Sequence, residues 1–432
     1  MKKTYYQCKL TQSAPLRVGT GAGDETDSDV MTDSRGLPFV PGTSIAGVLR
    51  TYLTETDADR LFGHMQISRS TPRMQESKVL VSDATLPGRT KEGRDFRIVP
   101  RHGVGLTDNG TAKAGALFDF ETVECKMPYV TVLELADDVN DSEKLALEAA
   151  LQRAVDQGIS FGARTTRGYG KMQAEVTKRE FDLPAQLSEW LTFNAFEEDR
   201  FGGEPLASSK RAQSDQLEIV AELAFEGSFS VREYTTRLAK TREKVAPDYS
   251  PLTNINEKPV IPGTSWAGCF RHHMKTFVYD SIRNDEERAQ LLKEIDELFG
   301  KTENKKKRSE ILFSETSVDG GKDYTVTRIA VDRFTSAPRN QGLYSSSVAW
   351  GGKGNLRIVL PADTSSVLLR LLAAALIDLD IGLLVIGGEG GVGRGLCKIA
   401  RLTVNGAEQT QSIQAHRVDF LETGGIRHGQ ME

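Results

Sequence analysis

The chain has 432 residues, a formal net charge of −5, and 38% hydrophobic and 27% charged residues, a composition typical of a globular protein with two or three domains. The acidic balance argues against binding of bulk nucleic acid by charge alone, while still allowing a local basic groove. No apolar run approaches the roughly 20 residues of a membrane span, the first residues lack the apolar segment of a secretory signal, and the four scattered cysteines suit a reducing compartment, so we expect a cytoplasmic protein.

The first half of the chain is predicted to follow the order β-α-β…β-α-β. The patterns predict helices after residue 41 and at 141–156, and strands at 3–10, at 79–84, at 122–135 and up to residue 176. Thr43 or Ser44 is expected to cap the first helix, because a hydroxyl there can accept a free backbone N–H. The intervening segments 11–38 and 86–116 are rich in glycine and polar residues, which favours loops.

The second half repeats this order after a segment without strong periodicity. Helices are predicted after residue 262 and at 367–379, and strands at 217–225, 311–316 and 396–403. We therefore expect a first domain at 1–178, a linker at 179–214 and a second domain at 215–432. The predicted fold class is α+β, with two tandem ferredoxin-like (RNA-recognition-like) domains that carry long insertions.

A decapeptide that occurs twice supports an internal duplication. Residues 41–50 read PGTSIAGVLR and residues 262–271 read PGTSWAGCFR, an offset of 221 (262 − 41). The offset holds without a gap back to residue 27, with ten identities in the 24 positions 27–50. Unrelated sequences would share about one or two. Such self-similarity indicates two copies of one structural unit.

Each copy of the decapeptide is followed, much later, by a glycine-rich loop, at 161–171 and at 386–395. Glycines let a phosphate approach backbone N–H groups, a helix N-terminus attracts anions, and nearby cations add charge. The alternative is a pair of tight turns with arginines on the surface. The residues that we expect at RNA phosphates are, in the first half, Gly42, Thr43, Ser44, Arg50, Arg164, Arg167 and Lys171, and in the second half, Gly263, Thr264, Ser265, Arg271, Arg394 and Lys398.

Four motifs together resemble the RAMP superfamily. They are LPxxPGTSxxGxxR, LFG, SDA and the terminal GxxxxRGxGK of the first half. More narrowly, the chain is similar to the backbone subunits of type III CRISPR effector complexes, and its two domains resemble the fused backbone subunits of some subtypes. This resemblance implies that the protein binds guide (CRISPR) RNA, meets target single-stranded RNA, and assembles with other effector subunits.

The resemblance also implies a catalytic aspartate in a loop upstream of the PGTS motif. Asp27 stands in the matching Asp-Ser-x-Val context, whereas Asp248 matches in the aspartate alone. The implied reaction is attack of an RNA 2′-hydroxyl on the neighbouring phosphate. An ordinary Asp, with a pKa of about 3.9, is a weak base at neutral pH, which favours a carboxylate that holds a divalent metal ion such as Mg²⁺. The sequence leaves the other metal ligands unassigned.

Other functions remain open at this point. The basic loops 86–116 and 333–354 are interpreted as thumb-like hairpins of the kind that, in this family, kink a guide–target duplex. The chain could instead be a structural subunit that holds guide RNA without cutting, or a guide-processing endoribonuclease. The latter usually needs a histidine near the first helix, where the first half offers only His64 and His102. A non-CRISPR enzyme on the same scaffold is a further alternative.

Overall fold

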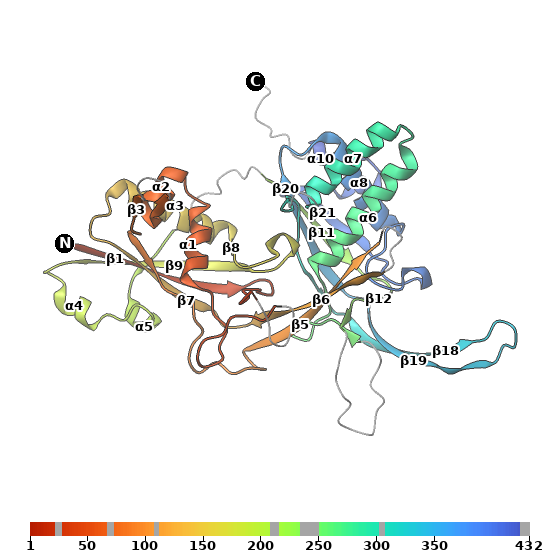
Figure 1. Ribbon diagram of the computed structural model, residues 1–432, viewed down its shortest axis with the longest axis horizontal. Helices are drawn as coiled ribbons and strands as arrows, with labels where there is room; N and C mark the ends of the chain where they lie inside the picture. Colours follow the sequence, from red (N-terminus) through yellow and green to blue (C-terminus); the bar gives the residue numbers. More distant parts are fainter. Residues whose placement is uncertain are drawn as a thin grey trace. The chain divides into compact units, whose positions relative to one another are not determined.

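The computed structural model describes residues 1–21, 28–66, 73–107, 112–207, 216–233, 250–301 and 307–423 (Figure 1). The fold is mixed α+β, and the chain divides into two compact units. The first unit comprises Met1–Arg101, Asp119–Thr165 and Tyr169–Gln213, and the second comprises His102–Phe118, Thr166–Gly168 and Ser214–Glu432. None of the described helices combines the length and apolarity needed to cross a membrane.

The first unit is built on an antiparallel sheet. Its strand order is β10 (Glu204–Pro205), β9 (Lys171–Asp182), β1 (Lys2–Gln12), β7 (Tyr129–Leu135) and β4 (Val79–Val81), with β8 (Ile159–Ser160) paired to β9. Its principal helices are α1 (Gly42–Arg50), α2 (Glu55–Phe62) and α3 (Asp141–Gln157). Successive side chains of β1 point to opposite faces: the Tyr6 hydroxyl donates to Glu148 of α3 at 2.8 Å, whereas the Tyr5 hydroxyl accepts from Trp190 Nε1 at 3.0 Å. Both faces of the central strand are therefore covered.

The segment that covers the second face is the one expected to be a linker. It forms α4 (Leu187–Thr192), α5 (Glu198–Phe201) and β10, and it packs on the sheet. Phe181 and Phe201 are buried there together with Tyr5 and Val132. Single aromatic residues on short elements anchor this segment to the sheet. Because they are not regularly spaced, the sequence shows no periodic pattern here.

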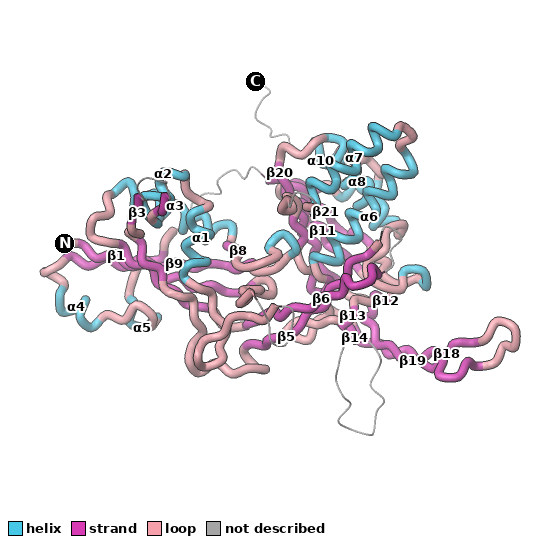
Figure 2. The backbone as a smooth tube through the Cα atoms, viewed as in Figure 1, coloured by secondary structure: helices cyan, strands magenta, loops and turns pink. Residues whose placement is uncertain are grey.

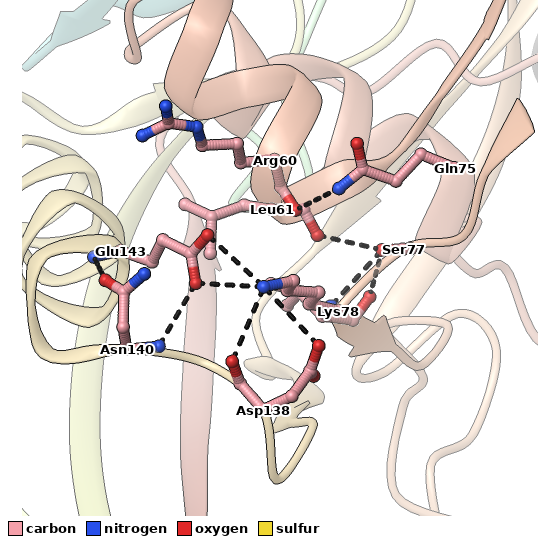
Figure 3. Close-up of polar contacts among 9 residues, drawn as sticks. Arg60, Leu61, Gln75, Ser77, Lys78, Asp138, Asn140 and Glu143 are labelled. Atoms are coloured by element: carbon pink, nitrogen blue, oxygen red, sulfur yellow. Dashed lines mark hydrogen bonds and ion pairs between the residues drawn. The ribbon is translucent and has the colours of Figure 1, made fainter. Parts of the chain in front are cut away.

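A polar network joins the end of α2 to the start of α3 (Figure 3). The Lys78 ammonium lies 3.2 Å from Glu143 Oε2 and 3.4 Å from Asp138 Oδ2. Glu143 is buried and also completes the capping box of α3 with Asn140. The hydrogen bond to Glu143 has the largest effect on the pKa of Lys78 and raises it. Partial burial lowers this pKa, but the net result is a pKa above the usual value. This network fixes the connection between the two helices.

The second unit repeats the architecture. Its sheet has the order β15 (Val260–Ile261), β17 (Thr316–Asp319), β20 (Lys353–Pro361), β11 (Gln216–Ala224), β21 (Lys398–Val404) and β22 (Ala407–Glu408), with β16 (Leu312–Phe313) paired to β20. Its helices are α6 (Gly263–Ser281), α7 (Asp285–Phe299), α8 (Ser366–Ile381), α9 (Thr410–Gln414) and α10 (Phe420–Thr423), of which α6 lies beside both α7 and α8 (Figure 1). By chain order, β9-β1-β7-β4 in the first unit matches β21-β11-β20-β17 in the second. The duplication seen in the sequence is thus also a duplication of strand order.

Each half carries a long hairpin outside its main sheet. In the first half β5 (Phe96–Leu106) pairs with β6 (Ala112–Cys125), and in the second half β18 (Lys322–Val331) pairs with β19 (Pro338–Trp350), which also pairs with β12 (Ser228–Phe229). Figure 2 shows β18 and β19 as a long paired ribbon that extends away from the helices of the second unit. The remaining short elements are β2 (His64–Gln66), β3 (Arg73–Gln75), β13 (Arg232–Glu233), β14 (Ser250–Pro251) and the single turns Thr165–Arg167 and Gly390–Val392.

Candidate nucleic-acid interface

The first PGTS helix begins after residue 41 as predicted, but its N-cap lies two or three residues earlier than expected. Pro41 is the N-cap of α1, no side chain caps the helix, and the Gly42 N–H donates to Asp83 Oδ1 at 2.8 Å. The prediction that Thr43 or Ser44 is the N-cap is therefore wrong. The Asp83 carboxylate, which follows β4, supplies the negative charge that a helix N-terminus favours, so this amide already has an internal partner.

The glycine of each PGTS turn is required by close packing. A Cβ on Gly42 would lie 2.3 Å from the Val81 carbonyl oxygen, and one on Gly263 would lie 2.1 Å from that of Phe313. Both glycines let the helix start press against the adjacent strand. Of the predicted hydroxyl residues that follow, Thr43 is exposed, and Ser44, Thr264 and Ser265 are half-buried.

The arginine that ends each decapeptide binds the next helix. Arg50 lies 2.6 Å from Asp59 and donates to the carbonyls of Ala58 and Gly63 at 3.0 and 2.7 Å. Arg271 binds Asp296 at 2.7 Å. Both aspartates stand two residues before the Leu-Phe-Gly motif, at 59–63 and 296–300. This repeated Asp-x-Leu-Phe-Gly was the sequence signal for a structural partner, and sequence analysis missed it.

The two glycine-rich loops close with the same backbone hydrogen bonds. The Phe161 N–H donates to Gly170 O and the Ile386 N–H to Gly395 O, both at 3.0 Å. A Cβ on Gly170 would lie 1.9 Å from the Phe161 oxygen, and one on Gly395 would lie 2.1 Å from that of Ile386. These glycines make the tight turn possible, which is the structural role that sequence analysis kept as an alternative.

In the first unit the loop gathers two arginines around one ring. The guanidinium carbons of Arg17 and Arg164 lie 4.3 and 4.5 Å from the centroid of Phe120, and Tyr169 meets the same ring edge-on at 5.8 Å. Burial lowers the pKa of both arginines, and Arg17 lowers that of Arg164 further. Guanidinium planes and an aromatic ring suit phosphates and stacked bases. Arg164 was predicted at this site, whereas Arg17 and Phe120 were not.

Two other predicted cations of the first loop have different surroundings. Thr166–Gly168 group with the second unit, where Arg167 donates to the carbonyls of Phe299 and Ile311 at 2.5 and 3.4 Å and to Ser309 Oγ at 3.0 Å. The Arg167 guanidinium therefore donates mainly to backbone carbonyls of the second unit. Lys171 begins β9 and its carbonyl accepts the Ser13 N–H at 2.9 Å.

In the second unit the loop gathers three arginines around one carboxylate. Glu389 Oε1 lies 2.8 Å from Arg232 Nη2, and Glu389 Oε2 contacts Arg394 and lies 3.9 Å from Arg328 Nη1. The predicted residue Arg394 is buried within this cluster. Arg232, Arg328 and Glu389 were not predicted, because only the folded chain brings these segments together. Lys398, also predicted, donates from the surface to the Asp380 carbonyl at 2.7 Å.

Both aspartates proposed for catalysis, Asp27 and Asp248, lie outside the described residues. Within the described part of the chain, no group of three or more His, Cys, Asp or Glu side chains is arranged to hold a metal ion. The roles of the two aspartates and the requirement for Mg²⁺ therefore stay predictions.

Comparison with known protein families shows to which family the chain is related. The sequence pattern of the RAMP superfamily matches residues 10–173 and 202–398. The chain belongs to the RAMP superfamily. The two matched regions agree with two RAMP-type domains in one chain, and membership indicates a CRISPR-associated, RNA-binding subunit. A comparison with curated proteins found no match.

Proposed function

We propose that this chain is a backbone subunit of a cytoplasmic type III CRISPR effector ribonucleoprotein, with two fused ferredoxin-like RAMP domains that grip the guide RNA. Two findings support the proposal. The family match covers both halves of the chain, and both sheets have corresponding strand orders. A duplicated unit suits a long single-stranded guide, because each copy can hold one stretch of its backbone.

The observation that carries the proposal is the pairing of a tight glycine loop with arginines in both units. The first loop has Arg17 and Arg164 on Phe120, and the second has Arg232, Arg328 and Arg394 around Glu389. Guanidinium groups recognise phosphate without reading the base. A guide of variable sequence requires this kind of binding, and an aromatic ring adds stacking that every base can use.

The β18–β19 hairpin supports contact with a paired duplex. Its end carries exposed apolar side chains: Phe334 is 95% exposed, Leu343 is 67% exposed and Val331 is 52% exposed. Arg333 and Arg339 flank these residues and are exposed too. Apolar side chains can be driven between base steps, while cations bind the flanking phosphates. We propose that this hairpin acts as a thumb on the guide–target duplex.

We further propose that Asp27 and Asp248 each help to cleave the paired target RNA. The 2′-hydroxyl next to each scissile phosphate loses its proton to water and attacks the phosphorus. A 2′,3′-cyclic phosphate forms as the P–O5′ bond breaks, and the departing 5′-oxygen takes up a proton from water. A divalent ion such as Mg²⁺ would neutralise the developing charge. A single carboxylate is a weak magnesium ligand, so RNA phosphate oxygens and water would complete the coordination shell.

The test is purification of the native complex followed by sequencing of the RNA that co-elutes. The proposal predicts guide RNA with repeat-derived ends, and cleavage of complementary RNA with Mg²⁺ that EDTA stops. Guide RNA without cleavage under either condition would make the chain a structural subunit. Metal-independent cleavage of repeat RNA by the isolated protein would instead make it a guide-processing enzyme.

A further inference from the structure

The environment of Glu389 is unusual for a loop carboxylate. Its three cationic partners come from separate segments: Arg232 from β13, Arg328 from β18 and Arg394 from the loop itself. The side chain of Arg394 is 4% exposed, while those of Arg232 and Arg328 are 26% and 32% exposed. Three positive charges against one negative charge leave an excess of +2 (3 − 1) among these four side chains. Part of that excess faces solvent.

The charges around Arg394 show how strongly the cluster depends on this carboxylate. Burial lowers the pKa of Arg394, Glu389 raises it, and Arg328 and Arg232 lower it again. Glu389 has the larger effect of the two described groups that raise this pKa, the other being Tyr344. A buried guanidinium needs such a counter-ion. Without bound nucleic acid, Glu389 therefore keeps three mutually repelling arginines together.

The first unit has the opposite charge at the same place. Arg164 is the third residue after the closing residue Phe161, as Glu389 is the third after Ile386. Both adopt left-handed backbone conformations, with φ of 59° and 64°. The two loops share their closing hydrogen bonds, so the frame is the same. What differs is that the second loop places an anion where the first places a cation.

We propose that Glu389 is an internal occupant of a phosphate site formed by Arg232, Arg328 and Arg394, and that a phosphate of the guide RNA takes its place when RNA binds. A carboxylate and a phosphate present similar oxygen pairs to a guanidinium fork. The carboxylate keeps the site assembled in the free protein and competes with RNA for it. This inference rests on the proposed RNA-binding function.

The test compares Glu389→Gln with Glu422→Gln in the full chain, using a labelled single-stranded RNA. The two glutamates are matched, since their side chains are 21% and 20% exposed and each binds an arginine. Glu422 lies in α10 and binds Arg370 of α8. Glu389→Gln should bind RNA on the order of fivefold more tightly, and its log–log salt slope should steepen by about 0.7. Glu422→Gln should bind as the parent chain does.

Each outcome is decisive. If folded Glu389→Gln binds RNA no more tightly than the parent chain, the inference is overturned while the proposed function stands. If the parent chain itself fails to bind RNA, both are overturned. Should Glu389→Gln fail to fold, Arg328→Gln takes its place: about threefold weaker RNA binding is expected, and unchanged binding would overturn the inference.

Discussion

The two glycine-rich loops share a backbone but differ in charge. Both close with an N–H to carbonyl bond of 3.0 Å across the loop, and both have a left-handed residue at the same position. That residue is Arg164 in the first unit and Glu389 in the second. The comparison shows that glycines determine the backbone of the loop, while the side chains at the same position determine its charge. Duplicated units can therefore diverge in local charge without any change in the backbone of the loop.

The largest expected effect separates the two halves by their cleavage products. Asp27→Ala and Asp248→Ala should each reduce one set of target-RNA products by at least about 100-fold, with guide binding retained. Gel analysis of cleaved, end-labelled target measures this, and Asp29→Asn in the same acidic segment is the control. A double variant that still cuts at both positions would refute the assignment of the aspartates.

Substitution of the equivalent glycine in each glycine-rich loop should destabilise both units to a similar extent. Gly170→Ala and Gly395→Ala place a Cβ about 2 Å from a carbonyl oxygen, at φ of 74° and 85°. Each should lower the free energy of unfolding by about 3 kcal/mol, from steric overlap and left-handed strain together. Gly391→Ala, where a Cβ meets nothing within 4 Å, is the control for denaturant unfolding. If one of the two variants lost much less free energy of unfolding than the other, the two loops would not be structurally equivalent.

Lys78 in the first half and Glu310 in the second half make matching backbone hydrogen bonds but differ in the role of their side chains. The Lys78 N–H donates to Leu61 O at 2.8 Å, as the Glu310 N–H donates to Leu298 O at 3.0 Å. Only Lys78 neutralises a buried carboxylate, that of Glu143, whereas Glu310 is exposed. Lys78→Met should therefore cost about 2 kcal/mol of stability, and Glu310→Gln should cost little. Thermal unfolding of both variants tests this, and equal melting temperatures would contradict the account.

The smallest expected effect concerns the Asp296 carboxylate. Partial burial opposes its ionisation, but Lys275 and Arg271 outweigh this and hold the pKa of Asp296 below its usual value. Asp296→Asn should lower the free energy of unfolding by about 1 kcal/mol near neutral pH. The stabilisation exists above the unfolded-state pKa of about 3.9 and disappears as the pH falls through the lower folded-state value.

Denaturant unfolding at neutral and strongly acidic pH checks this sign, with Asp59→Asn as the counterpart in the first half. The gap between Asp296→Asn and the parent chain should shrink on acidification. A gap that stays constant would mean that the charge of Asp296 does not stabilise the fold.

The duplication and the order of strands and helices could be predicted because they depend on local patterns. The PGTS decapeptide, the Leu-Phe-Gly motif and the glycine-rich loops mark equivalent points in each half, and the strand orders agree with them. The helices begin after residues 41 and 262 as predicted, but the N-cap was assigned wrongly, because proline and not a hydroxyl residue is the N-cap at Pro41 and Pro262. Residues 179–207 of the segment expected to be a linker pack on the first sheet through single aromatics such as Phe181 and Phe201, which no periodic pattern marks in the sequence.

The candidate site could be predicted only in part. Arg164 and Arg394 stand in recognisable loops, but their partners come from distant segments: Phe120 lies on β6, Arg232 on β13 and Arg328 on β18. Arg50 and Arg271 looked equally suited to phosphate, yet each binds a nearby aspartate. Whether a cation faces RNA or its own chain depends on tertiary pairing, which spacing along the sequence does not encode.

The most direct test of the central claim is ultraviolet cross-linking of the bound guide RNA in the assembled complex, followed by mass spectrometry of the cross-linked peptides. The account predicts cross-links in peptides around both glycine-rich loops, 161–171 and 386–395, and at Phe120 beside the first. Cross-links confined to one half, or absent from both loops, would contradict the claim that the two units hold guide RNA in the same way.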